Sequence, residues 1–271
     1  MHAASHGTAR FHLPLRARGA AEVAASKRQS SRVRVADREL SYSWVIYDLA
    51  RQGKDDAAAA FLQAMAADDI KPNSFAYQAV LNGYAKHLNK WQKAVGVFGE
   101  MQRSAIKPTA MHYAAVMDSC GKAGEAKRAE RWFGAMKKNF VDPNTVCYNV
   151  IINAHARQGD PAGASKWFQR MRQAKLIDIV AYNSLLHSLR QCGTLGTMTQ
   201  PSMVQEAEKL FRELRPEKLL EDLAPTAVTL DLLASIVGDA RRDQLCEELD
   251  VDVEEASRLD QERHRSVRPL M

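Results

Sequence analysis

The sequence contains no apolar run near 18 residues, so it offers no candidate membrane-spanning helix. It also lacks a Gly-rich phosphate loop, a nucleophile elbow and a His-Glu-x-x-His pair, so we expect neither an enzyme nor a cofactor. The four cysteines form no Cys-x-x-Cys pair and show no metal-ligand spacing with the eight histidines. A metal site and a disulfide scaffold are therefore not expected, and a reducing compartment fits best. Cys120 falls on an apolar helix face, which favours a buried free thiol.

Charge is unevenly distributed along the chain. Residues 1–36 carry seven Lys/Arg and one Glu, residues 37–214 carry 23 basic and 17 acidic residues, and residues 215–271 carry 8 and 14. The basic, Ala- and Ser-rich leader, residues 1–37, is typical of a transit peptide for a mitochondrion or chloroplast. The alternatives are a disordered basic arm or a start placed upstream of the true domain. A polyanionic partner is permitted by this balance but not required.

From about residue 38 one pattern recurs at a nearly fixed period. Its opening tyrosines are 35, 36, 35 and 34 residues apart: Tyr42, Tyr77, Tyr113, Tyr148 and Tyr182. Self-similarity at this period indicates a solenoid. We expect a repeat array over residues 38–233 and acidic capping helices over residues 234–271. The expected units are 39–73, 74–109, 110–144, 145–178 and 179–226, with a degenerate unit from residue 227.

Each unit has the apolar spacing of two amphipathic helices. In the third unit the two stripes are Tyr113, Val116, Met117 and Cys120, then Ala129, Trp132, Phe133 and Met136. A small alanine precedes the apolar pair of every second helix, where two helices must approach. Four glycines are expected to cap the first helices in a left-handed conformation: Gly53, Gly124, Gly159 and Gly193. The fifth unit carries an insertion around Thr194–Met203. The predicted fold is an all-α solenoid of stacked helix-turn-helix repeats.

The residues of the units also resemble a known family. Residues 146–152 read Val-Cys-Tyr-Asn-Val-Ile-Ile and are followed by Gly159, Ala164, Trp167-Phe168 and Met171. This pattern resembles the pentatricopeptide repeat, and the endings Lys71-Pro72-Asn73 and Asp142-Pro143-Asn144 resemble the family's repeat ending. Tetratricopeptide repeats have a similar length, but no unit here shows their Trp-x-x-Leu-Gly-x-x-Tyr start. The resemblance covers about residues 39–233 and supports the predicted solenoid.

The resemblance implies binding of single-stranded RNA, typically an organellar transcript, with one base read per repeat. In the family the base is read by the residue after the opening aromatic together with the last residue of the same repeat. The corresponding pairs are Ser43 with Asn73, Gln78 with Thr109, Ala114 with Asn144, Asn149 with Asp178, and Asn183 with Thr226. The first pair is similar to the family's adenine-reading pair and the fourth to its uracil-reading pair, whereas Gln78 and Ala114 depart from the usual choices. Alternatively, Ser43, Asn73, Asn144, Asn149 and Asp178 are simply helix caps.

Two further positions recur in the units. The residue two before each tyrosine is always apolar: Leu40, Phe75, Met111, Val146 and Val180. In the family this position sandwiches the base, although a hydrophobic staple at the start of the helix would explain it too. Nine residues after the tyrosine lie Arg51, Lys86, Lys122 and Arg157, and Gln191 breaks the series. A basic stripe of this kind would suit phosphate contacts, or the cations would interact with helix C-termini.

Two functions follow from these patterns. The first is a single-stranded RNA-binding protein acting in organellar RNA stability, processing, splicing or translation, with other proteins of an RNA-processing complex as further partners. The second is a protein-interaction scaffold or an accessory subunit of an organellar ribonucleoprotein. Cations lining the concave groove together would favour RNA, whereas an apolar groove would favour a protein.

Overall fold

The computed structural model describes residues 39–258, apart from residues 41, 196–199, 215–223, 255 and 257. The predicted leader and residues 259–271 of the expected capping helices lie outside the described residues. Within them, helices dominate and no residue is in a strand. The helices follow one another in pairs: residues 42–51 with α2 (Asp55–Ala67), α3 (Ser74–Ala85) with α4 (Trp91–Arg103), α5 (Ala110–Lys122) with α6 (Ala126–Lys138), α7 (Thr145–Arg157) with α8 (Pro161–Gln173), α9 (Ile179–Leu195) with α10 (Gln200–Glu213), and α11 (Ala227–Val237) with α12 (Asp239–Leu249).

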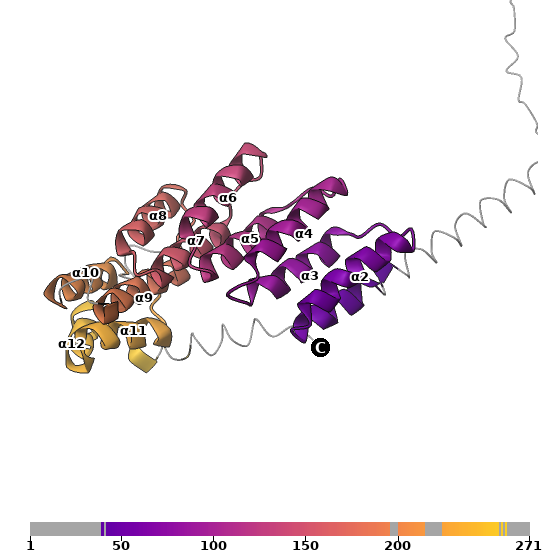
Figure 1. The fold of residues 1–271 in the computed structure, drawn as a ribbon. Helices are drawn as coiled ribbons and strands as arrows, with labels where there is room; N and C mark the ends of the chain where they lie inside the picture. The colour runs from indigo at the N-terminus through magenta and orange to yellow at the C-terminus, as the bar shows by residue number, and fades with distance from the viewer. Residues whose placement is uncertain are drawn as a thin grey trace, which may run out of the picture.

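The pairs stack into two rows, as Figure 1 shows. The first-helix row consists of residues 42–51, α3, α5, α7, α9 and α11, and each of the helices from α3 onward packs on the next one in this row. The second-helix row consists of α2, α4, α6, α8 and α10. From α4 onward, each of these helices packs on the first helix of its own pair and on the first helix of the next pair. The predicted α-solenoid is therefore confirmed.

Aromatic side chains join the two rows. Tyr113 of α5 lies with its ring centroid 4.8 Å from that of Phe98 in α4, and Phe98 lies 5.0 Å from Trp132 in α6. The next unit repeats this arrangement with Phe133, Tyr148 and Trp167. The expected small positions are completely buried in the same core: Ala58, Ala94, Ala129, Ala164 and Ala207. The core is thus one continuous layer between the rows, because no helix pair can bury its apolar stripe without its neighbours.

Three of the four glycines expected to cap first helices do so. Gly53, Gly124 and Gly159 have φ of 78°, 76° and 64°, in the left-handed region that favours glycine. The prediction for Gly193 is wrong, because α9 continues through this residue to Leu195. A Cβ on Gly193 would lie 2.8 Å from the sulfur of Met203, so the glycine permits the close approach of α10. The insertion in the fifth unit has lengthened α9, which has 17 residues where α7 has 13.

The second helices from α2 to α8 all end in the same way. A non-glycine residue adopts a positive φ of 56–57°, at Asp69, Ala105, Phe140 and Lys175. The N–H of the following apolar residue then donates to the carbonyl of a completely buried Met five residues back, for example from Ile106 to Met101 at 3.1 Å. This is the hydrogen bond of a Schellman motif, and it explains why the units close on a buried Met.

The C-terminal helix α12 is polar on its surface and is held to α10 by ion pairs. The Arg241 guanidinium donates to both carboxylate oxygens of Glu208, at 2.8 and 2.9 Å. Arg212 donates to Glu248 at 2.8 Å. The hydrogen bond from Arg241 is the main reason why the pKa of Glu208 lies below its ordinary value. Below these pairs, Leu245, Cys246 and Leu249 are buried, so α12 covers the apolar end of the described array.

Candidate nucleic-acid interface

A row of exposed apolar side chains follows the N-terminal turns of the first helices. The five predicted residues, Leu40, Phe75, Met111, Val146 and Val180, are 57%, 48%, 45%, 41% and 48% exposed. Val228 of α11, at 43% exposed, continues the row. A hydrophobic staple requires a residue before the N-cap, whereas Phe75, Met111 and Val146 each lie two residues after it. The staple interpretation is therefore wrong for these three, and the row is a candidate contact surface.

Two of the five predicted base-reading pairs are in direct contact. The Asn73 amide donates to the Ser43 hydroxyl at 3.2 Å and to the Glu39 carboxylate at 2.9 Å. The Asn149 amide donates to the Asp178 carboxylate at 2.8 Å. Ser43 is 2% exposed and Asn149 is 8% exposed, so the first member of each pair is buried. Both pairs therefore join residues roughly 30 positions apart, one on a first helix and one just before the next.

The capping alternative holds for the second member of several pairs. The Asn73 side-chain oxygen accepts from the N–H of Ala76 at 2.9 Å, and Asn144 and Asp178 cap α7 and α9 in the same way. Thr109 and Thr226 instead form capping boxes, which occupy their hydroxyls. Asn149 is not a cap, because it lies inside α7 and Asn144 is the N-cap. In Asp178 one carboxylate oxygen caps α9 and the other accepts from Asn149. Asp178 therefore caps the helix and pairs with Asn149 at the same time.

The other three predicted pairs are not joined by a hydrogen bond among the described residues. Gln78 donates to Asn82 at 2.7 Å in its own helix, and Ala114 is nearly buried and has no polar group. Asn183 also stands apart from Thr226, which is 3% exposed. However, Gln78, Asn149 and Asn183 share one feature. In each of these equivalent side chains the amide oxygen is buried and finds no hydrogen-bond partner in the protein. Buried acceptors are normally paired, so the recurrence of an unpaired one at this position in three units sets the position apart.

The four predicted cations contact different partners. Lys86 donates to the Ala50 carbonyl at 3.2 Å, and Lys122 donates to the Ala85 carbonyl at 2.6 Å and to Asp118 at 2.7 Å. These carbonyls belong to the end of the preceding first helix, so the helix-terminus interpretation holds for both lysines, across units. Arg51 pairs with Asp48 at 3.3 Å, and Arg157 is exposed on α7.

Cationic, apolar and base-reading positions meet in one shallow pocket between α3, α5 and α7. Its lining includes Lys86 and Lys122, the apolar Met111 and Val146, and Ala114. This pocket combines positive charge with apolar surface, so this part of the first-helix row is neither purely cationic nor purely apolar. A nucleotide has both a charged phosphate and an apolar ring face, and such a surface can contact the two together.

The sequence pattern missed one cation. Gln191 breaks the basic series, but Arg190 is exposed one residue earlier on α9. Burial, and then the charges of Arg190 and Arg157, lower the pKa of His187. Arg190 and Arg157 thus both lie near this imidazole, and Arg190 extends the basic positions to the fifth unit only with a shift of one residue. A search that allowed this shift would have found it.

No group of three or more His, Cys, Asp or Glu among the described residues could hold a metal ion. All four cysteines are free and buried, as expected for Cys120, and burial raises the pKa of that thiol to about 11. No described helix is long and apolar enough to span a membrane.

The fold and this edge define an all-α helical repeat solenoid with one continuous candidate contact surface. Comparison with known proteins then gives the family. Residues 143–191 match the PPR repeat family, and residues 60–123 and 120–158 match the pentatricopeptide repeat domain. Residues 60–191 therefore carry repeats of the pentatricopeptide repeat family.

Similar curated proteins are pentatricopeptide repeat-containing proteins of Arabidopsis thaliana. One is 32% identical over 91 residues, which cover 33% of this chain and 15% of that protein. Another is 31% identical over 108 residues, which cover 40% of this chain and 15% of that protein. A third, named as mitochondrial, is 30% identical over 91 residues, which cover 33% of this chain and 10% of that protein. The matches thus span less than a fifth of the length of these relatives.

Similar solved structures have the same solenoid fold. The pentatricopeptide repeat protein PPR10, in complex with an 18-nucleotide psaJ RNA element, has a TM-score of 0.63 and 20% identity, over 80% of this chain and 31% of that chain. The repeat domain of Arabidopsis thaliana protein-only RNase P 1, in complex with tRNA, has a TM-score of 0.52 and 13% identity, over 78% of this chain and 98% of that chain.

Proposed function

We propose that the chain binds single-stranded RNA along the exposed edge of its first-helix row and acts in organellar RNA metabolism, as a binding protein and not as an enzyme. The observation that carries this proposal is the buried, unpaired amide oxygen of Gln78, Asn149 and Asn183. Each of these oxygens is closed to solvent in this conformation, so a base would reach it only after the side chain turns outward. Pairing with the N–H groups of a base edge would then remove a cost of about 1–3 kcal/mol. Three units supply this acceptor at the same position. Recognition of one base per unit requires such a recurrence.

The other contacts of a nucleotide are provided nearby. Successive members of the apolar row, such as Met111 and Val146, would flank a base, while Lys86, Lys122 and Arg157 would contact phosphates. With five units the array would read about five bases. By the family pattern, the Ser43–Asn73 pair would favour adenine and the Asn149–Asp178 pair uracil.

The descriptions of similar proteins support this proposal. PPR10 and the repeat domain of protein-only RNase P 1 are both described in complex with RNA. One relative is named as mitochondrial, which supports an organellar role and fits the basic composition of residues 1–37.

The test is binding of the full chain to a random single-stranded RNA pool, measured by fluorescence anisotropy between about 50 and 200 mM salt. A groove variant carries Arg51→Ala, Lys86→Ala, Lys122→Ala and Arg157→Ala. A matched variant removes the same charge from exposed positions of the second-helix row, with Lys127→Ala, Arg131→Ala, Lys138→Ala and Lys166→Ala. If all four groove cations contact phosphates, the groove variant loses about 3 units of log–log salt slope, whereas the matched variant keeps the wild-type slope.

A protein-interaction scaffold is the second candidate. It is favoured by the unbroken apolar row and by the ion pairs of Arg51 with Asp48 and Lys122 with Asp118, which reduce the positive charge of the edge. Wild-type protein that fails to bind the pool even at low salt would contradict the RNA proposal and leave the scaffold. Equal losses in the two variants would instead show that the groove is not the binding edge.

A further inference from the structure

An exposed aromatic cluster lies at the N-terminal end of the exposed apolar row, beside Phe75. Trp44 and Tyr47 of the first helical segment are 62% and 39% exposed, and Phe75 of α3 is 48% exposed. The Tyr47 and Phe75 rings are stacked, with centroids 5.8 Å apart and an interplanar angle of 29°. Trp44 stands edge-on to both, at 5.8 Å from Tyr47 and 6.4 Å from Phe75. The three rings therefore form one aromatic surface across two units.

This surface is specific to the first unit. The positions equivalent to Trp44 in the next four units are small or aliphatic: Ala79, Ala115, Val150 and Ser184. Those equivalent to Tyr47 are polar or charged: Asn82, Asp118, Asn153 and His187. The helical repeat does not require the two aromatic residues, so their exposure needs a separate explanation.

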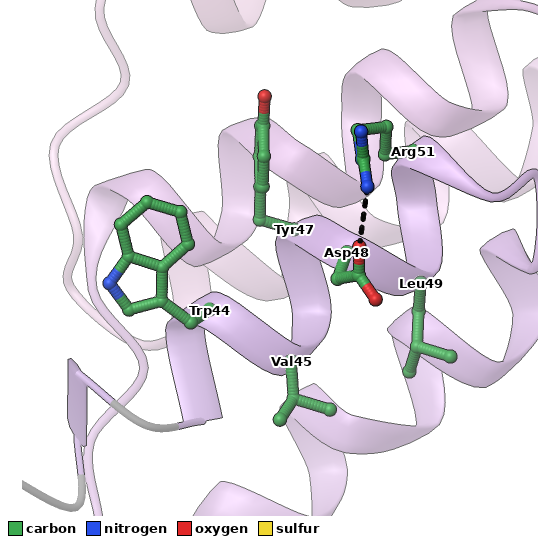
Figure 2. Close-up of a pocket in the computed structure, with 6 residues that line it drawn as sticks. All are labelled: Trp44, Val45, Tyr47, Asp48, Leu49 and Arg51. Carbon is green, nitrogen blue, oxygen red and sulfur yellow. Dashed lines mark hydrogen bonds and ion pairs between the residues drawn. The ribbon is translucent and has the colours of Figure 1, made fainter. Parts of the chain in front are cut away.

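The cluster shares one side of its helix with a cation. Trp44, Tyr47 and Arg51 are spaced i, i+3 and i+7, and they line one pocket together with Val45, Asp48 and Leu49. Figure 2 shows Tyr47 and Arg51 pointing to one side of the helix, whereas Val45 and Leu49 point to the other. Tyr47 and Arg51 thus share one side of the helix, and Val45 and Leu49 line the same pocket from the other side. The Arg51 side chain is 70% exposed, so its pair with Asp48 is weak and exchangeable.

We infer that Trp44, Tyr47 and Phe75 form a stacking site for one further unpaired base of the bound RNA, beyond those read along the units. This inference rests on the proposed function. Phe75 belongs both to the cluster and to the exposed apolar row, so the strand can pass from one to the other without a gap. Arg51 lies within reach of the adjoining phosphate. Ring faces offer little hydrogen-bond selection, so this site accepts any base and adds affinity without adding sequence preference.

The test uses the full chain and a 12-nucleotide single-stranded oligouridylate and oligoadenylate. Trp44 is the most exposed of the four tryptophans, since Trp167 is 4% exposed and Trp91 and Trp132 are partly buried. We expect both RNAs to quench tryptophan emission in the wild type, and Trp44→Phe to remove most of the quenching. In anisotropy titrations, Trp44→Ala and Tyr47→Ala should each weaken binding of both RNAs by about fivefold or more. Phe140→Ala is the matched control, because Phe140 is 94% exposed in the loop after α6.

The outcomes separate the two proposals. Wild-type protein that binds both RNAs, with no quenching of Trp44 and unchanged affinity in Trp44→Ala, overturns the stacking site and leaves the RNA-binding function intact. No binding by the wild type overturns the function itself. Sedimentation adds a third outcome: a dimer that Trp44→Ala converts to monomer, with unchanged RNA affinity, assigns the cluster to a contact between copies and overturns the stacking site. An affinity loss counts only if circular dichroism shows that the variant keeps its helical content.

Discussion

The two rows of helices differ in how much of each helix is buried, as a comparison of α5 with α6 shows. Nine of the 13 residues of α5 are buried, against four of the 13 residues of α6. Helix α5 is enclosed by first helices on both sides and by α4 and α6, so only a narrow strip reaches the surface. Helix α6 has one apolar face and a broad exposed one. Recognition by the first-helix row must therefore use few, well-oriented side chains.

Charge follows the same division. Helices α6 and α8 hold eight Lys/Arg and one Glu, whereas α5 and α7 hold two Lys/Arg and one Asp. On α6 the exposed Lys127, Arg131 and Lys138 lie opposite the buried face by helical periodicity. The basic balance of the repeat block is thus mainly a property of the second-helix row, and it says little about the groove.

The largest expected effect comes from breaking the aromatic contact between the rows. Phe98 is completely buried against Tyr113 and Trp132. Phe98→Ala should lower the free energy of unfolding by about 3–5 kcal/mol, since a large cavity remains. The same substitution at the exposed Phe140 should change it by less than about 0.5 kcal/mol. Urea unfolding followed by circular dichroism measures both. Similar losses in the two variants would show that the rows are not held together by these rings.

Alanine substitutions at two glycines, one in each row, should change stability by an intermediate amount. A Cβ on Gly121 of α5 would lie 2.7 Å from the Cβ of Ala154 in α7, whereas a Cβ on Gly134 of α6 would meet nothing within 4 Å. Gly121→Ala should destabilise the protein by about 1–3 kcal/mol through overpacking. Gly134→Ala should stabilise it by up to about 1 kcal/mol, because alanine favours the helix. The shift of the urea midpoint measures both effects. Stabilisation by both substitutions would contradict close packing within the first-helix row.

The smallest effect concerns a polar network that links the rows and depends on pH. Glu130 of α6 accepts from Trp167 of α8 at 2.7 Å and lies 3.0 Å from the buried His155 of α7, which also contacts Asp160 at 2.8 Å. Burial raises the pKa of Glu130, but these hydrogen bonds and the nearby Lys127 outweigh it, so its pKa lies below the ordinary value of 4.5. A depressed carboxyl pKa contributes stability above its unfolded value and loses it as pH falls through the folded value.

Wild-type protein should therefore lose stability between about pH 5 and pH 3, and Glu130→Gln should lose less over the same range. Urea midpoints across this range measure the difference. Glu247→Gln, at an exposed carboxylate on α12, serves as the control and should behave as the wild type. Identical profiles for Glu130→Gln and the wild type would remove the network as a source of pH dependence.

The fold was accessible from the sequence because each unit repeats the same apolar spacing. The tyrosines, the buried alanines and the closing methionines recur at one period, and a helix pair with that spacing can bury its stripe only by stacking. The prediction failed at Gly193, since no local signal shows that the insertion extends a helix. The site was predicted less completely. Equivalent positions can be aligned, but their partners come from neighbouring helices, as for Lys86 with Ala50.

Period and pattern were thus enough to determine the solenoid, the family and the positions worth testing, because these depend on local helix formation and nearest-neighbour burial. Packing between units decided the rest. It left the amide oxygens of Gln78, Asn149 and Asn183 buried without partners, directed most of the cations of α6 and α8 outward, and exposed Trp44 and Tyr47 beside Phe75. Exposure and hydrogen-bond partners are properties of the assembled rows, which residue order alone does not specify.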